Sequence, residues 1–213
     1  EGNFPQLGQM ANSHAFLTFS HHIRADGSTF HLVDFSRDTG EAVSFRTHQG
    51  LRANSTWSRG QAWAIAGFAM AYRYTQIPEF AEAVIAAGQY FMDHLPEDKV
   101  APWDFAAGPQ AAKDTSANAI AAVGFLDFAK VLAAMGEEEL AREYAQKARE
   151  LLSALHPYSI FTSEEHESQD GLLTGGTYAF PRGEAIEECL IWGDYYYLKG
   201  LLELMEWNRK KSD

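Results

Sequence analysis

The chain has little of several things that would narrow its class. Its 213 residues include one cysteine, Cys189, so no intrachain disulfide can form, and this thiol lies in an apolar, helix-like run that favours a buried, unreactive side chain. Seventeen basic residues face 29 acidic ones, and the formal charge of −12 argues against binding nucleic acid or an anionic membrane. Charged or small polar residues interrupt the apolar stretches, so no membrane span is expected. The compartment stays open between the cytoplasm and the periplasm of a bacterium.

What the chain does have is enough apolar sequence for one sizeable core. Apolar residues make up 46% of the sequence and aromatic residues 13%. Their three- and four-residue spacing predicts one all-α domain over residues 1–213, with helices at about residues 7–23, 58–75, 79–95, 117–135, 137–155 and 184–207. Residues 29–54 form a long connection with two β-prone segments, FHLVDF and AVSFR, and are expected to carry a small hairpin.

Helices rich in small residues alternate with charged ones. The helices expected at 58–75 and 117–135 contain many alanines and glycines, which permit close helix contacts, whereas the helix at 137–155 is charged. Ser58 and Gln61 form a capping-box pattern at the start of the first of these. Alternating inner and outer helices are typical of an α/α toroid, whose inner helices all begin at one mouth. A binding site is expected at that mouth.

Aromatic and planar polar side chains gather at the start of the second helix. Trp57, Arg59 and Trp63 follow His48 and Gln49 within the segment THQGLRANSTWSRGQAW. An aromatic face suits the C–H surface of a sugar ring, and planar donors suit its hydroxyls or a carboxylate. The same spacing also suits a structural role, in which both tryptophans fill the core and the arginine pairs with a buried acid.

Several sequence blocks resemble the unsaturated glucuronyl hydrolases, glycoside hydrolase family 88. The main ones are THQGLRANSTWSRGQAW, PWDF…KDTSANAIAA and GTY…IWGDYYYL, and SHAFLT and FHLVDF extend the resemblance over nearly the whole chain. The resemblance implies an (α/α)6 toroid that hydrolyses the unsaturated uronyl oligosaccharides left by polysaccharide lyases, with no metal or other cofactor. In that reaction an aspartic acid protonates the C4=C5 double bond of the uronate, and water adds at C5.

Carried over position by position, the resemblance implies substrate-binding roles for His31, Gln49, Trp57, Arg59, Trp63 and, as a weaker match, Tyr178. Arg59 is expected to hold the substrate carboxylate, and the tryptophans are expected to contact the sugar ring or its neighbour. No catalytic residue is assigned, because the two aspartates of the family would precede Glu1. Asp104 and Asp114 lie near the expected mouth, but a structural role for Asp104 and a helix N-cap role for Asp114 are favoured.

A chain of about six helices supplies only about half of a twelve-helix ring, so the sequence predicts a domain that lacks its N-terminal half. Exposed flanks of the inner helices would then be covered by that half or by self-association. Two functional alternatives remain open: a catalytically inactive sugar-binding or interaction module, and an unsaturated rhamnogalacturonyl hydrolase. The sequence RGQAW favours the glucuronyl enzymes. The histidines, acids and thiol show no spacing typical of a metal site.

Overall fold

The computed structural model describes residues 4–160 and 171–210, and this part of the chain is mainly helical, as predicted. Its α-helices are α1 (Pro5–His22), α2 (Ser58–Thr75), α3 (Pro78–Asp93), α4 (Thr115–Ala134), α5 (Glu138–Ala154) and α6 (Ile191–Arg209). Two short 3-10 helices, η1 (His156–Tyr158) and η3 (Phe180–Arg182), lie in the last long connection. The ends of the first five α-helices differ from the predicted ends by two residues or fewer.

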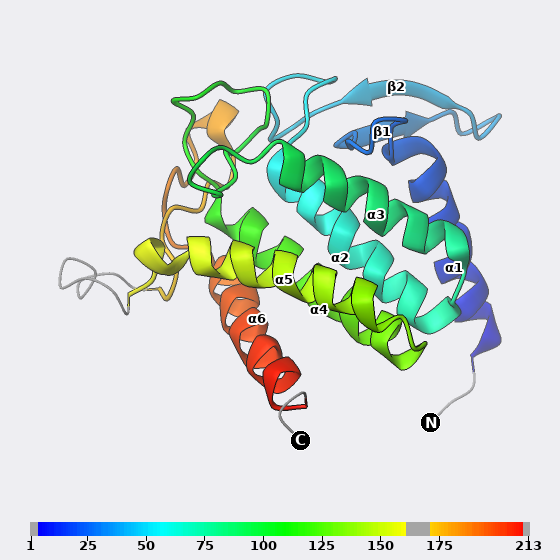
Figure 1. The fold of residues 1–213 in the computed structure, drawn as a ribbon. Helices are drawn as coiled ribbons and strands as arrows, with labels where there is room; N and C mark the ends of the chain where they lie inside the picture. The colour runs from blue at the N-terminus through cyan, green and yellow to red at the C-terminus, as the bar shows by residue number, and fades with distance from the viewer. Residues whose placement is uncertain (1–3, 161–170, 211–213) are drawn as a thin grey trace.

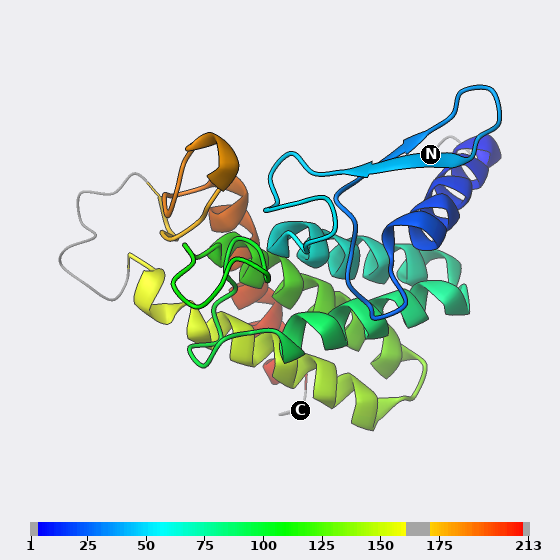
Figure 2. The same cartoon turned by 90° about the horizontal axis from the view of Figure 1, so that it is seen from above.

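The predicted hairpin is present in the long connection between α1 and α2. Strands β1 (Leu32–Phe35) and β2 (Ala42–Arg46) pair antiparallel, and the turn between them contains Gly40 at a φ of 74°. Asp34 accepts hydrogen bonds from Ser44 and from the Arg46 guanidinium across the two strands. Figure 2 shows the hairpin lying over α1 and the beginning of α2, which places this loop beside the expected mouth.

Helix α4 is the centre of the core. It contacts α2, α5 and α6, and most of its residues are buried. At Gly124 a Cβ atom would lie 2.8 Å from the Cα of Ala66, so glycine is what lets α4 approach the backbone of α2. Figure 1 shows α3 beside α2 and α5 beside α4, with α6 at the other edge. The expected alternation therefore holds here: α2 and α4 pack on each other, and α3 and α5 cover them.

Within residues 4–160 and 171–210, one helix is apolar and long enough to cross a membrane, judged by its length and composition alone. The window lies in α4, between Thr115 and Ala134, and the sequence reading had overlooked it. Eighty-three per cent of that window is buried inside the fold, which is what the core helix of a packed domain shows.

Helix α1 is attached more loosely than the others. None of its residues is fully buried. Phe16 packs on Phe80 with ring centroids 5.0 Å apart, and Phe19 meets Phe68 edge-on at 6.2 Å. These contacts hold α1 near α2 and α3 but leave space between α1 and α2, which the pocket described below occupies.

The N-terminal ends of α2, α4 and α6 meet, as the sequence predicts for inner helices. The backbone N–H of Ser58 donates to the carbonyl of Trp103, and that of Thr115 donates to the carbonyl of Gly175. At the start of α6, the indole N–H of Trp192 donates to the hydroxyl of Ser116, 3.3 Å away. The loops before α4 and α6 are thus tied to the helix starts at one end of the molecule.

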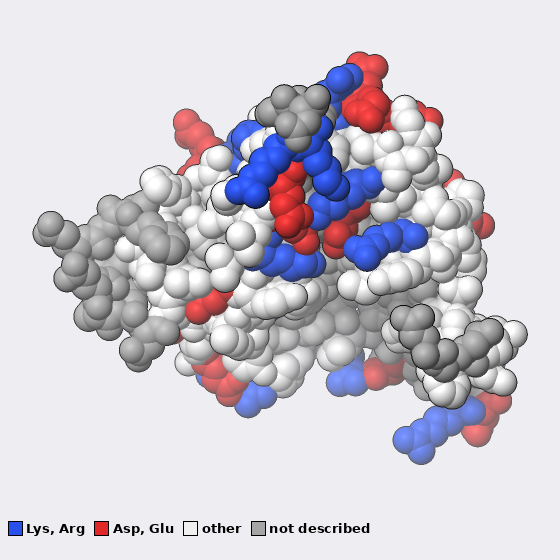
Figure 3. All heavy atoms as spheres, turned by 90° about the horizontal axis from the view of Figure 1, so that it is seen from below, with Lys and Arg blue, Asp and Glu red and all other residues white. Residues whose placement is uncertain are grey.

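Acidic and basic side chains are interleaved on the face of the molecule that lies opposite the gathered helix starts (Figure 3). Lys199 lies 3.9 Å from Asp127 and 3.5 Å from Glu203, and Lys130 lies 3.1 Å from Glu203. These ion pairs join α4 to α6 on the far side from the gathered helix starts.

Two details of the predicted helix starts are wrong. Ser58 is not an N-cap, because Trp57 holds that position. The Ser58 hydroxyl donates to the carbonyl of Trp103. The Gln61 side-chain amide donates to the backbone carbonyls of Gly27 at 2.7 Å and of Ala87 at 3.0 Å. Helix α6 begins at Ile191 and not at about Glu184. The preceding residues form isolated antiparallel bridges within the loop, so Cys189 lies outside the helix and is half-buried.

Candidate functional site

A pocket of about 350 Å³ opens between α1, α2 and the chain leading into the hairpin. His31, Trp57 and Trp63 line it, so the structure brings three of the six expected substrate-binding residues to one cavity. The wall from α1 includes His14 and Thr18. Most of the lining is apolar, with a few polar groups, which is the usual character of a small-molecule site.

Trp57 is held in a stack at the start of α2. Its ring lies 4.4 Å from the His31 ring, at an interplanar angle of 30°, and the Arg59 guanidinium carbon lies 4.7 Å from its centroid. A Cβ atom at Gly60 would lie 2.8 Å from the same indole, so glycine is required for this ring position. Only 8% of Trp57 is exposed, and it therefore forms a wall behind His31 more than an open platform.

The His31 side chain is neutral near pH 7. Burial, together with the neighbouring His48 and Arg59 side chains, lowers its pKa from 6.5 to about 4. Its Nδ1 atom lies 3.0 Å from the Thr47 hydroxyl and accepts the backbone N–H of His48 at 3.3 Å. With Nδ1 accepting, the proton of the neutral ring sits on Nε2, which makes His31 a hydrogen-bond donor.

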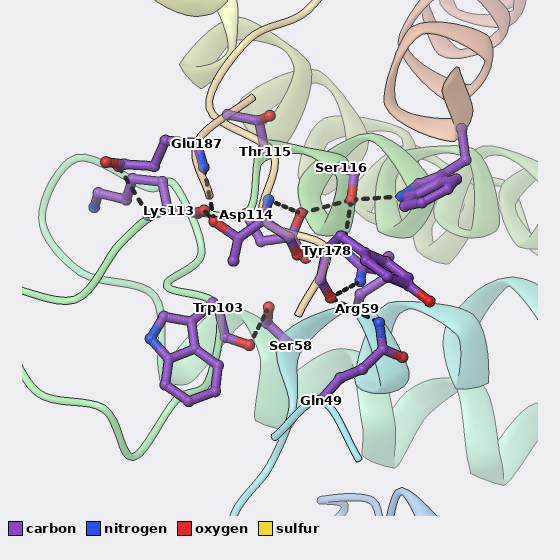
Figure 4. A network of polar contacts seen from close by, with 12 residues as sticks. Gln49, Ser58, Arg59, Trp103, Lys113, Asp114, Thr115, Ser116, Tyr178 and Glu187 are labelled. Atoms are coloured by element: carbon purple, nitrogen blue, oxygen red, sulfur yellow. Dashed lines mark hydrogen bonds and ion pairs between the residues drawn. The ribbon is translucent and has the colours of Figure 1, made fainter. Parts of the chain in front are cut away.

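Arg59 lies at the centre of an internal polar network (Figure 4). Its Nη1 atom donates to the Asp114 carboxylate at 2.6 Å and to the carbonyl of Thr177 at 2.7 Å, and its Nη2 atom donates to the carbonyl of Tyr178 at 2.7 Å. The residue is 2% exposed and Asp114 is fully buried. Burial raises the pKa of Asp114, and the adjacent guanidinium and a hydrogen bond from Ser116 oppose that rise.

This network changes the role expected for Arg59. Its guanidinium points inward, to one carboxylate and two carbonyls. The sequence allowed either a substrate contact or a pairing with a buried acid, and the structure shows the pairing with the buried acid. Asp114 does occupy the N-cap position of α4, but its carboxylate makes no capping bond and binds Arg59 and Ser116 instead. The ion pair joins the starts of α2 and α4 to the loop before α6.

Tyr178 and Gln49 connect that loop to the hairpin side of the site. The carbonyl of Tyr178 accepts the side-chain amide of Gln49 at 2.6 Å, next to the bond from Arg59 (Figure 4). The Tyr178 ring is 37% exposed and lies 5.9 Å from the Trp192 ring. Trp63 is 38% exposed and meets Tyr196 edge-on at 5.2 Å. Of the aromatic rings of Trp57, Trp63 and Tyr178, those of Trp63 and Tyr178 are therefore the exposed ones.

Asp104 has the structural role that the sequence favours. It is fully buried and accepts the backbone N–H of Leu51 at 2.9 Å, the hydroxyl of Ser55 at 2.7 Å and the N–H of Ala106 at 3.0 Å. These bonds pin the segment that follows the hairpin to the loop before α4. Neither Asp104 nor Asp114 lines the pocket.

Three supporting residues were missed by the sequence reading. Thr47 orients His31 and also accepts the N–H of Gly50 at 2.8 Å, while Trp192 and Tyr196 contact the exposed aromatic rings. The two aromatic residues lie in the block IWGDYYYL, so their signal was present in the sequence. Among residues 4–160 and 171–210, no group of three or more histidine, cysteine or acidic side chains could hold a metal ion.

No model of a protein family matches the chain. Among curated proteins, it is 35% identical over 202 residues to an unsaturated chondroitin disaccharide hydrolase of Streptococcus pyogenes serotype M1, an alignment that covers 93% of this chain and 50% of the relative. Among solved structures, it resembles the unsaturated glucuronyl hydrolase of Bacillus sp. GL1 with a TM-score of 0.87 and 33% identity, over 94% of this chain and 52% of that one.

A further similar structure is a variant unsaturated glucuronyl hydrolase of Streptococcus agalactiae in complex with dGlcA-GalNAc6S. The TM-score is 0.78 at 33% identity, and the alignment covers 93% of this chain and 52% of that chain. The fold and these matches show that the chain is similar to one part of known helical glycan-degrading hydrolases. More particularly, it is a homologue of the unsaturated glucuronyl hydrolases, which confirms the family expected from the sequence blocks, and it spans about half the length of the curated relatives it matches.

Proposed function

We propose that residues 1–213 form the substrate-binding half of an enzyme that hydrolyses unsaturated glucuronyl oligosaccharides. The observation that carries this proposal is the pocket beside the start of α2, where His31, Trp57 and Trp63 meet in a chain homologous to such hydrolases. Its aromatic and donor groups suit a sugar, and a related protein has been solved with an unsaturated disaccharide bound.

Each expected site residue has a chemical task in this proposal. The exposed ring of Trp63 packs against the sugar, and the Nε2–H of His31 donates to a hydroxyl or to the attacking water. Tyr178, which does not line the pocket, offers a second exposed ring. Gln49 positions the Tyr178 loop and offers its amide at the rim. Arg59 acts indirectly, by fixing the positions of Trp57 and of the Tyr178 backbone.

The reaction proposed begins with protonation of the C4=C5 double bond of the uronate. Water then adds at C5, the hemiketal opens, and the glycosidic bond breaks without a pair of carboxylates flanking it. Asp104 and Asp114 are both fully buried and hydrogen-bonded, so neither is offered as the proton donor. The proton donor is therefore not assigned to either of these two aspartates.

A second candidate function is a sugar-binding module without catalysis. The structural roles of Asp104 and Asp114 favour it, because the described pocket contains no carboxyl group. The two candidates share the binding site and differ only in turnover.

Mixing the protein with an unsaturated chondroitin disaccharide distinguishes them. Titration calorimetry reports binding, and loss of the ultraviolet absorbance of the conjugated double bond reports turnover. For the 213-residue chain we expect binding without loss of absorbance, and binding weakened about fivefold in Trp63→Ala, since a stacked ring contributes on the order of 1 kcal/mol. Val43→Ala, an exposed change on β2 away from the pocket, is the matched control and should bind like the wild type. Absence of binding in the folded wild-type protein would contradict the proposal.

A further inference from the structure

The Arg24 side chain joins the end of α1 to the residues that precede α2. Its Nη1 atom donates to the carbonyl of Asn54 at 2.7 Å. Its Nη2 atom donates to the carbonyls of Thr29 at 2.7 Å and of Ser55 at 3.0 Å, and to the hydroxyl of Thr56 at 2.8 Å. One guanidinium therefore binds two segments of the chain, which lie before and after the β1–β2 hairpin (Figure 2).

Each of these two segments leads into a wall residue of the pocket. The first segment reaches His31 within two residues, and the second continues directly into Trp57, whose ring lies 4.4 Å from the His31 ring. The Arg24 guanidinium carbon also lies over the ring of Phe30, 4.5 Å from its centroid. The distance that Arg24 sets between the two segments therefore decides whether the imidazole and the indole stay in contact.

The segment before α2 is held by side chains of opposite charge. Asp104 accepts a backbone N–H and the Ser55 hydroxyl from this segment, whereas Arg24 donates to the carbonyls of Asn54 and Ser55. Burial lowers the pKa of Arg24, and the negative charges of Asp26 and Asp104 oppose that change, so the guanidinium stays charged. A planar fork of donors can serve several acceptors at once, which a single ammonium cannot do.

We propose that Arg24 is a positioning residue, which holds the His31 ring against Trp57 at the wall of the pocket. Arg24 does not line the pocket itself, so it acts through these two rings. The use of the rings for a sugar rests on the proposed function, whereas their positioning requires no ligand. Without the guanidinium, the segment that carries His31 should move away from the start of α2, and the imidazole should become exposed to water.

The titration of His31 in an NMR pH series tests this role in the absence of sugar. In the wild type, burial and the neighbouring charges lower the pKa of His31 to about 4. In Arg24→Ala that pKa should rise toward 6.5, because an exposed imidazole is easier to protonate. The side chains whose charges act on His31 are those of His48, Arg59 and His22. Loss of the Arg24 charge therefore does not explain such a rise.

Two further variants separate geometry from charge. Arg24→Lys keeps the positive charge but cannot bind both segments, so its His31 should also titrate above about 4. This milder change carries the test if circular dichroism shows that Arg24→Ala has lost its helices. The matched control is Arg73→Ala, which removes the same charge from a half-exposed arginine in the last turn of α2 and should leave the His31 titration unchanged.

A His31 titration that stays near 4 in the folded Arg24 variants would overturn the proposal, and so would an equal shift in Arg73→Ala. Calorimetry with the unsaturated chondroitin disaccharide gives a separate readout. Arg24→Ala should bind it about fivefold more weakly, the effect of losing one hydrogen bond from His31. If the wild type does not bind the disaccharide, the proposed function fails, while the titration of His31 still decides the role of Arg24.

Discussion

The buried ion pair between Arg59 and Asp114 provides the sharpest test of how the site is held together. Replacing Arg59 with alanine leaves the Asp114 carboxylate, which is fully buried, without its cation. The same change removes the donors to the carbonyls of Thr177 and Tyr178. We therefore expect the segment before α6 to detach from the start of α2, and the free energy of unfolding to fall.

The expected loss is about 3–5 kcal/mol, the usual cost of leaving one buried partner uncompensated. Chemical denaturation monitored by circular dichroism measures it. Adding Asp114→Asn to the Arg59→Ala background should restore part of the loss, because an amide is easier to bury than a carboxylate. Arg46→Ala removes the partner of Asp34 in an exposed ion pair and should change the unfolding free energy little.

Two results would refute the reasoning. A loss below about 1 kcal/mol in Arg59→Ala would show that the pair contributes no more than an exposed one does. A further loss on adding Asp114→Asn would show that Asp114 is held by its other hydrogen bonds and not by the guanidinium.

The remaining predictions concern single positions in the site and the core. Burial lowers the pKa of His31 to about 4, so its ring should titrate in an NMR pH series well below 6.5; the folded protein then loses stability as pH falls from about 6.5 toward 4, and a titration near 6.5 would contradict the assignment. Gln49→Ala should weaken disaccharide binding by loosening the Tyr178 loop while leaving the thermal midpoint within a few degrees, and unchanged affinity would remove Gln49 from the site. Gly124→Ala should destabilise the fold by about 1–3 kcal/mol in denaturant titrations, because its Cβ would meet the backbone of α2; a neutral effect would show that α2 and α4 can move apart.

Much of the fold could be predicted because its signals are local. The three- and four-residue periodicity located α2 to α5, and two β-prone segments located the hairpin. The start of α6 was misplaced, since the residues after Glu184 have a helix-like composition and only their bridges within the loop keep them extended. The position of the helix start at Ser58 was right, but its capping box was wrong because Ser58 and Gln61 bond to distant backbone groups.

The site was harder to predict because its decisive contacts join distant parts of the chain. Arg59 and Asp114 are 55 residues apart, and Gln49 reaches a carbonyl 129 residues away. The spacing around Trp57 suits both a sugar platform and a core filling, and the burial of each ring decides between them. Trp63 and Tyr178 have exposed rings, whereas Trp57 and Arg59 are buried.

The most direct test of the central claim is a chimera. In a full-length unsaturated glucuronyl hydrolase, the half that this chain matches would be replaced by residues 1–213, and absorbance loss would be followed with an unsaturated chondroitin disaccharide. The account predicts turnover by the chimera and a strong reduction in the same chimera with Trp63→Ala. A folded chimera that binds the disaccharide without turnover, or whose turnover is indifferent to Trp63→Ala, would contradict the claim that this chain supplies the substrate-binding half of such an enzyme.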